Sequence, residues 1–222
     1  MPDRKKVIAI NGSPRRMWNT AALLEKALEG AFSKGAETKL IHLYDLQYKG
    51  CISCFACKTR GGESYGCCTV RDDLQPVFQE IEKADTVVLG SPIYFGAVSG
   101  QMRCFMERWM YPYLSYTDPQ KSLFPGRLQT AFIYTMNVND EGLEKRGMRD
   151  FYYSHFDANK GILTRLFGNS TYMLAMNTLQ FEDYSKVVAD IFDPAAKARS
   201  RKEQFPVDCE KAFHLGIKLT RS

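Results

Sequence analysis

Short apolar runs alternate with helix-like stretches along most of this 222-residue chain. The run KVIAIN at 6–11 is typical of a strand that is buried on both faces. Apolar residues then recur at spacings of three and four from Ala21 to Ala31, which predicts one face of a helix. Because such pairs repeat, the sequence predicts an α/β fold with a parallel sheet covered by helices on both faces.

The expected elements follow the same two periodicities throughout. We predict five strands, at 6–11, 38–45, 86–92, 129–137 and 171–179, and helices at 21–31, 74–81, 101–110, 150–167 and 207–219. Asp72 and Asp73 directly precede the second helix, so we interpret them as caps rather than as catalysts.

The chain length is that of one domain, and we expect a single domain over residues 1–222. Two connections, 110–128 and 138–149, are longer than usual and are predicted to be extended loops. Loops of this length commonly act as lids, pocket walls or subunit contacts.

Composition excludes several classes of function. The net charge of +5 is mild, and the compact basic run KARSRK at 197–202 is interpreted as a solvated segment, so we expect no nucleic-acid partner. No apolar run has the length of a membrane span, and the first strand follows charged residues without a secretory signal pattern. We expect a cytoplasmic protein with no membrane partner, whose seven cysteines are thiols or metal ligands rather than disulfides.

The segment NGSPRRMWNTAALL follows the first strand and opens the first helix. It has no G-x-G-x-x-G, and the G-x-x-x-x-G from Gly30 to Gly35 lacks the Lys of a P-loop. A helix N-terminus binds anions through its free N–H groups and its dipole. Ser13, Asn19 and Thr20 can donate to a phosphate there, with charge from Arg15 or Arg16; the alternative is that Asn19 or Thr20 only caps the helix.

The segment GSPIYFGAVSGQM follows the third strand and offers a flat apolar wall. Pro92 restricts the backbone, Gly96 permits close approach, and Ile93, Tyr94 and Phe95 supply the surface. Ligands of parallel sheets bind beyond the carboxyl ends of the strands, where both segments lie. Together they favour a phosphorylated planar cofactor over helix capping alone.

The two segments, GSPR-x-x-x-NT and GSPIY-x-G-x-x-SG-x-M, resemble those of the NADPH-dependent FMN reductase family of flavodoxin-like proteins. This family includes quinone reductases and iron–sulfur flavoproteins. The resemblance covers about residues 6 to 137 and implies a flavodoxin-like three-layer sandwich with a five-stranded parallel sheet. It also implies FMN as cofactor, NADPH or NADH as co-substrate, and a homodimer or homotetramer.

The resemblance assigns roles position by position. Ser13, Arg15, Asn19 and Thr20 are expected to hold the FMN phosphate, while Asn137 matches the third flavin loop. The isoalloxazine and ribityl chain are expected to contact Ser91, Pro92, Ile93, Tyr94, Phe95 and Gly96. Met17 and Trp18 stand where many relatives have Asn-Gly, and their side chains either shield the flavin or pack against the first helix.

The stretch GCISCFACKTRGGESYGCC at 50–68 holds five of the seven cysteines. Cys51, Cys54 and Cys57 have the spacing of ferredoxin-like cluster ligands, and Cys67 or Cys68 could supply a fourth ligand. However, this stretch is longer than the compact motif of the iron–sulfur branch, and many relatives without a cluster keep similar cysteines, often beside the flavin pocket. A 4Fe–4S cluster on Cys51, Cys54, Cys57 and Cys68 therefore stays an alternative, and cluster-free thiols are preferred.

Three functions are compatible with these features. The preferred one is an FMN-dependent oxidoreductase that takes a hydride from NAD(P)H and reduces a small acceptor such as a quinone or free flavin, with the flavin rather than a side chain carrying the chemistry. The second is an iron–sulfur flavoprotein that transfers single electrons. The third, a phosphate-binding protein without flavin, leaves the aromatic wall unexplained.

Overall fold

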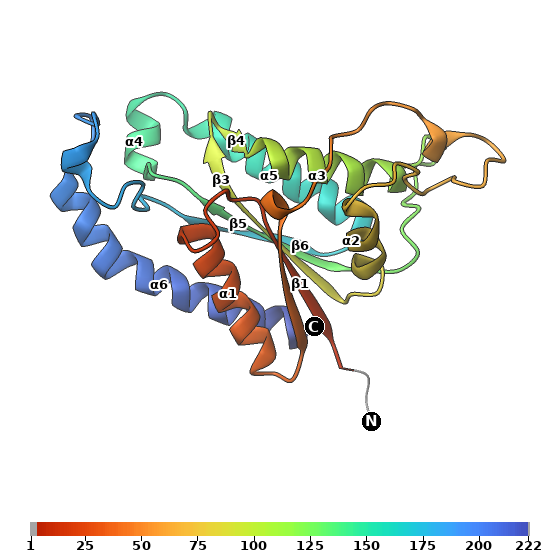
Figure 1. Ribbon diagram of the computed structural model, residues 1–222, viewed down its shortest axis with the longest axis horizontal. Coiled ribbons are helices and arrows are strands. Elements are labelled where there is room, and N and C mark those ends of the chain that lie inside the picture. The colour runs from red at the N-terminus through yellow and green to blue at the C-terminus, as the bar shows by residue number, and fades with distance from the viewer. Residues whose placement is uncertain (1–3, 222) are drawn as a thin grey trace.

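The computed structural model describes residues 4–221, and its centre is a sheet of parallel strands (Figure 1). The strands are β1 (Lys6–Asn11), β2 (Glu37–His42), β3 (Thr86–Tyr94), β5 (Gln129–Thr135) and β6 (Ser170–Ala175), in the order β2-β1-β3-β5-β6. A two-residue strand, β4 (Ala97–Val98), pairs antiparallel with the end of β3. The predicted α/β architecture with a five-stranded parallel sheet is confirmed.

Helices cover both faces of the sheet, which makes three layers (Figure 1). One face carries α1 (Asn19–Phe32) and α6 (Pro194–Arg221). The other carries α2 (Leu74–Ile81), α3 (Gly100–Met110) and α5 (Arg149–Phe167). A short helix, α4 (Asp140–Lys145), follows β5 at the carboxyl ends of the strands. None of the helices described between residues 4 and 221 is both long and apolar enough to cross a membrane.

Two apolar cores lie on opposite sides of the sheet, because successive strand residues point to opposite faces. In β1, Ile8 and Ile10 belong to the core under α2, α3 and α5, whereas Val7 and Ala9 belong to the core under α1 and α6. All four side chains are completely buried. This double burial explains why the strand is a continuous apolar run in the sequence.

Helices α1 and α6 lie in direct backbone contact. A Cβ atom on Gly216 would be 1.8 Å from the carbonyl oxygen of Ala27, and one on Gly30 would be 1.9 Å from that of Phe213. Glycine at both positions therefore permits a closer approach than any other residue would allow. This contact holds α6 beside the helix that opens the predicted phosphate site.

Several predicted element ends are wrong. The strands predicted to end at 45, 137 and 179 end at His42, Thr135 and Ala175, because the chain turns away once its partner strands end. The helix predicted to begin at position 207 begins thirteen residues earlier, at Pro194. The polar run KARSRK and Pro206 hide this first half in the sequence, and Lys197 in that run is buried rather than solvated.

The two predicted loops contain local structure. Within 138–149 the chain forms α4, whose first turn is capped by the side chain of Asn139 accepting from the Gly142 N–H at 3.0 Å. Within 110–128, residues Tyr111–Tyr113 form a 3₁₀ turn, and Leu114 bridges to Ser122. Segment 138–149, predicted to be an extended loop, thus contains a short helix.

Candidate functional site

The loop after β1 is shaped by hydrogen bonds between near neighbours. The Ser13 N–H donates to Oδ1 of Asn11 at 3.0 Å, and the Arg15 N–H donates to Oγ of Ser13 at 3.2 Å. Helix α1 then begins with Trp18 at its N-cap position, and no side chain caps it. The capping role considered for Asn19 or Thr20 is therefore wrong, and the N-terminal amides of α1 keep the character of an anion site.

Contacts with segments far along the chain hold the polar side chains of this loop. Thr20 Oγ1 lies 2.8 Å from Thr135 Oγ1 at the end of β5. Nδ2 of Asn19 donates to the carbonyl of Leu179 at 2.8 Å, while Nη1 of Arg201 on α6 donates to Oδ1 of Asn19 at 2.9 Å. Ser13, Asn19 and Thr20 are all buried. The amide of Asn19 thus has a fixed orientation.

Residues 178–180 lie across the same loop, which the sequence did not indicate. The indole N–H of Trp18 donates to the carbonyl of Leu179 at 3.0 Å, and Nη1 of Arg15 donates to that of Gln180 at 2.5 Å. Met17 is 92% exposed, so of the two atypical residues only Trp18 packs into this contact.

The loop after β3 forms the opposite wall. The Ser99 N–H donates to Oγ of buried Ser91 at 3.0 Å, and Oγ of Ser99 donates to the carbonyl of Gly12 at 2.6 Å, which ties the two loops together. Ser99 also caps α3. At the tip, Phe95 and Gly96 both have positive φ angles, of 51° and 81°, and Phe95 is 99% exposed. Ser99 was missed in the sequence, although a serine before a helical run is a capping signal.

Most of the predicted flavin residues line one cleft that encloses about 120 Å³. They are Ser13, Arg15, Asn19, Thr20, Pro92, Ile93, Tyr94 and Asn137, joined by Trp18, Thr135, Met136, Thr178, Leu179 and Gln180. Ser91, Phe95 and Gly96 do not line it: Ser91 is buried and supports the loop through Ser99, and Phe95 and Gly96 form the tip of the loop beside the cleft. Burial raises the pKa of Tyr94, so its hydroxyl stays protonated at neutral pH and presents a neutral ring.

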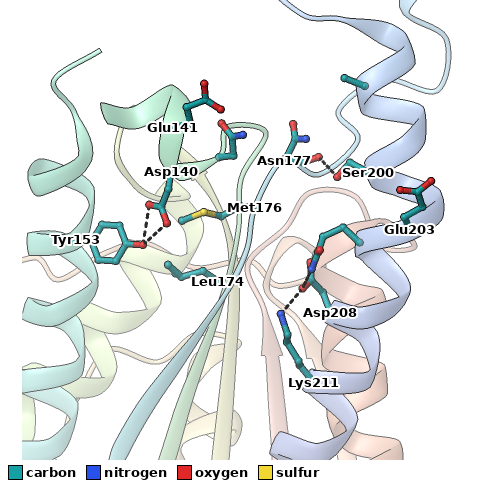
Figure 2. Close-up of a pocket in the computed structure, with 13 residues that line it drawn as sticks. Asp140, Glu141, Tyr153, Leu174, Met176, Asn177, Ser200, Glu203, Asp208 and Lys211 are labelled. Atoms are coloured by element: carbon teal, nitrogen blue, oxygen red, sulfur yellow. Dashed lines mark hydrogen bonds and ion pairs between the residues drawn. The ribbon is translucent and has the colours of Figure 1, made fainter. Parts of the chain in front are cut away.

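A larger cavity of about 750 Å³ lies beyond the edge strand β6, between α6 and the α4–α5 corner (Figure 2). It contains none of the predicted flavin residues. Two of its carboxylates have partners within the cavity wall: Tyr153 donates to Asp140 at 2.9 Å, and Lys211 lies 3.3 Å from Asp208 (Figure 2). We assign the candidate site to the smaller cleft, because only that cleft combines phosphate donors with an aromatic rim.

The cysteine loop packs against the C-terminal half of α3. Cys51, Cys54, Cys57 and Cys68 line a narrow pocket together with Arg108. The guanidinium of Arg108 donates to Sγ of Cys68 at 3.0 Å and pairs with Asp72 at 2.8 Å, and it also binds the carbonyls of Lys49 and Val70. Asp72 is therefore an ion-pair partner that also accepts from the Leu74 N–H, while Asp73 accepts from Gln47 instead of capping α2.

Lys58 anchors the other side of this loop. Its Nζ atom donates to the carbonyls of Tyr111 and Leu114 at 2.6 and 2.5 Å, and also to that of Pro112. The loop thus follows the end of α3, whereas the cleft lies at the opposite end of that helix, and the two pockets share no lining residue. We expected the thiols to lie beside the flavin pocket. Within one chain they instead line a different pocket from the candidate flavin residues.

Thiolates are suitable cluster ligands, but their arrangement here does not fit a metal. Among residues 4–221, no group of three or more His, Cys, Asp and Glu side chains is placed to hold a metal ion. Cys57 is buried, and burial raises the pKa of its thiol, while Cys51, Cys54 and Cys67 are exposed. None of the seven cysteines forms a disulfide.

Comparison with known proteins agrees with this geometry. The family model described as NADPH-dependent FMN reductase matches residues 5–134, which is more than half of the chain. An iron–sulfur flavoprotein of Methanocaldococcus jannaschii is 41% identical over 103 residues, which cover 46% of this chain and 51% of the relative. One of Archaeoglobus fulgidus is 39% identical over 103 residues, which cover 46% and 48%. The chain thus spans about half the length of the curated relatives it matches.

A solved structure extends the likeness to the whole fold. The NAD(P)H:quinone oxidoreductase of Methanothermobacter marburgensis superposes with a TM-score of 0.70 at 15% identity, over 98% of this chain and all of that one. At this identity the likeness concerns the fold alone. With the match over residues 5–134, it follows that the chain belongs to the NADPH-dependent FMN reductase family, whose cofactor is FMN.

Proposed function

We propose that the protein is an FMN-dependent oxidoreductase that takes a hydride from NAD(P)H and passes the electrons to a small acceptor such as a quinone or free flavin. One observation carries the proposal. The uncapped N-terminus of α1 and the aromatic end of β3 meet in one cleft, although they are about seventy residues apart in the chain. Such a pair of walls suits a ligand that has a phosphate at one end and a planar ring at the other.

The floor of the cleft fits the phosphate end of FMN. Ser13, Asn19 and Thr20 are buried polar side chains beside free helix amides, and Arg15 adds a positive charge at the rim. Hydrogen bonds from such groups to an anion are charge-assisted and strong. The second N–H of the Asn19 amide remains available after its bond to Leu179.

The rim fits the ring. The enclosed floor of about 120 Å³ is smaller than ligand pockets for molecules of this size, so the isoalloxazine would extend past it, along Pro92, Ile93, Tyr94 and Phe95. Asn137 would face it from the third loop. Bound FMN supplies the hydride-accepting and electron-donating chemistry. The chain binds and orients it, and no side-chain acid or base is required.

The proposal also covers the location, assembly and partners of the protein. We place the protein in the cytoplasm as a homodimer or homotetramer, with neither nucleic acid nor a membrane as partner. The proposal also takes residues 1–222 as a single domain that binds one FMN.

A second candidate is electron transfer by an iron–sulfur flavoprotein. The observation that favours it is the gathering of Cys51, Cys54, Cys57 and Cys68 around one pocket, together with the names of the two curated relatives. The present placement of the thiols does not fit a cluster, so the first candidate stands ahead of it.

Anaerobic reconstitution tests the proposal. The apoprotein is mixed with FMN, and NADPH or NADH is then added in the absence of acceptor while the visible flavin absorbance is followed. We expect stoichiometric FMN uptake and rapid bleaching. Failure to bind FMN would refute the proposal, while slow bleaching together with iron and sulfide in anaerobically purified protein would favour the second candidate.

A further inference from the structure

Lys197 in the first turn of α6 is a buried lysine with neutral partners. Its side chain is 4% exposed, and its Nζ atom donates to Oδ1 of Asn177 at 2.6 Å and to the carbonyl of Asn137. The ring of Phe192 lies 5.1 Å away. Among residues 4–221, no carboxylate forms a salt bridge with it. Lysine is almost never this buried unless an opposite charge accompanies it.

Two effects make a charged Lys197 unfavourable at this position. A cation in the first turn of a helix is opposed by the helix dipole. Burial also lowers the pKa of Lys197 to about 8, and no charged neighbour offsets this lowering. Asp193 precedes it, but its carboxylate accepts the amides of Ala195 and Ala196, and Arg201 one turn later binds Asn19. Asn137 and Asn177 on the facing segments are neutral.

The ammonium lies between the two cavities. Asn137 lines the candidate flavin cleft, and Asn177 lines the larger cavity, where Figure 2 shows it facing Ser200 of α6. Lys197 binds both residues, so it lies behind Asn137, on the side away from the candidate flavin cleft. The side chain of Asn137 also donates to Gln180, which holds Asn137 from a second segment.

We propose that Lys197 is an electrostatic positioning residue that stabilises FMN selectively in its reduced form, an inference that rests on the proposed function. A hydride brings two electrons and one proton, so the neutral isoalloxazine gains one negative charge as NAD(P)H becomes NAD(P)⁺. A cation held in a low-dielectric interior interacts strongly with such a charge and needs no reorganisation. Arg15 and Arg201 are exposed, and solvent screens them.

The experiment measures the midpoint potential of the bound flavin by anaerobic dye titration, together with the dissociation constants of oxidised and reduced FMN. The variants are Lys197→Met, Lys197→Gln and Lys197→Arg. Lys202→Met, an exposed lysine of the same helix, is the control. We expect Lys197→Met and Lys197→Gln to weaken reduced FMN about tenfold relative to oxidised FMN, which lowers a two-electron potential by about 30 mV. Lys197→Arg and Lys202→Met should stay near the wild type.

The pH dependence of the flavin midpoint potential provides an independent test. Reduced FMN raises the pKa of Lys197, so above pH 8 reduction takes up an additional proton at Nζ, and the potential falls more steeply with pH than in Lys197→Met. Equal potentials in the wild type and both neutral variants, or no added slope in the wild type, would overturn the inference while leaving the proposed function intact. A wild type that binds no FMN would instead refute the proposed function.

Discussion

The candidate flavin cleft and the cysteine loop are both built from loops that follow strands, but they are held in different ways. The cleft begins with contacts between near neighbours, such as the Ser13 N–H to Asn11 and the Arg15 N–H to Ser13. The cysteine loop is held by two cations, Arg108 from α3 and Lys58 binding the 111–114 segment. In the cleft the second N–H of the Asn19 amide and the N-terminal amides of α1 remain available, whereas Arg108 and Lys58 at the cysteine loop each have three or more partners within the protein.

This difference separates a binding site from a structural anchor. Donors that remain available can bind a ligand, while a guanidinium that already has four protein partners stabilises the loop it touches. We therefore expect changes in the cleft to alter FMN affinity and changes under the cysteine loop to alter stability. The following predictions test that separation, starting with the largest effect.

Replacing Arg108 with Met should lower the free energy of unfolding by about 3 kcal/mol or more, because the largely buried carboxylate of Asp72 would lose its opposite charge. The side chains of Arg108 and Asp72 are 1% and 15% exposed. Urea denaturation measures the loss. The control is Arg103→Met on the same helix. The side chain of Arg103 is 58% exposed, and its ion pair with Glu107 is worth about 0.5 kcal/mol or less. Equal losses in the two variants would contradict the anchoring role.

Replacing Asn19 and Thr20 together with Ala should weaken FMN binding by about a hundredfold or more, since each lost bond to the phosphate is worth about 1.5–3 kcal/mol. Both residues also contact other loops, so affinity for riboflavin, which lacks the phosphate, serves as the internal control. Fluorescence titration should show that the preference for FMN over riboflavin falls by that same factor. An unchanged preference would mean that the phosphate binds elsewhere.

Replacing Gly96 with Ala should cost about 1–2 kcal/mol, because φ is +81° and the new Cβ would lie 2.1 Å from the ring of Phe151. Since this loop forms the rim, we expect part of that cost to appear as FMN affinity reduced by about tenfold. Gly35→Ala is the matched control: its φ is +84°, nothing lies within 4 Å of the new Cβ, and it is at the other end of α1. Calorimetry with and without FMN distinguishes the two, and equal FMN affinities would contradict the assignment of the rim.

Replacing Cys54 with Ser should have the smallest effect. Its exposed thiol has no ligand role in our proposal, so folding, FMN binding and hydride acceptance from NADPH should match the parent. About four iron and four sulfide per subunit in the anaerobic parent, both lost in the variant, would reverse this conclusion and favour the iron–sulfur candidate.

The alternation of strands and helices, and the chemistry of the loops after β1 and β3, could be predicted from the sequence. Apolar periodicity reports burial over a few residues, and the turn at Asn11–Arg15 depends only on neighbours. The eight predicted residues that line the cleft come together for the same reason, because the carboxyl ends of parallel strands meet at one edge.

What the sequence alone could not show depends on contacts between distant segments. Segment 178–180 lies over the β1 loop, and Arg201 binds Asn19 across 182 positions. Lys197, in a run that resembles a solvated basic segment, is buried because the start of α6 packs against the segments after β5 and β6, where Lys197 binds Asn137 and Asn177. No local pattern encodes such pairings, since they depend on how whole helices pack on the sheet. Only the tertiary structure decided which polar residues face the cleft, which anchor a loop, and which lysine is buried behind Asn137.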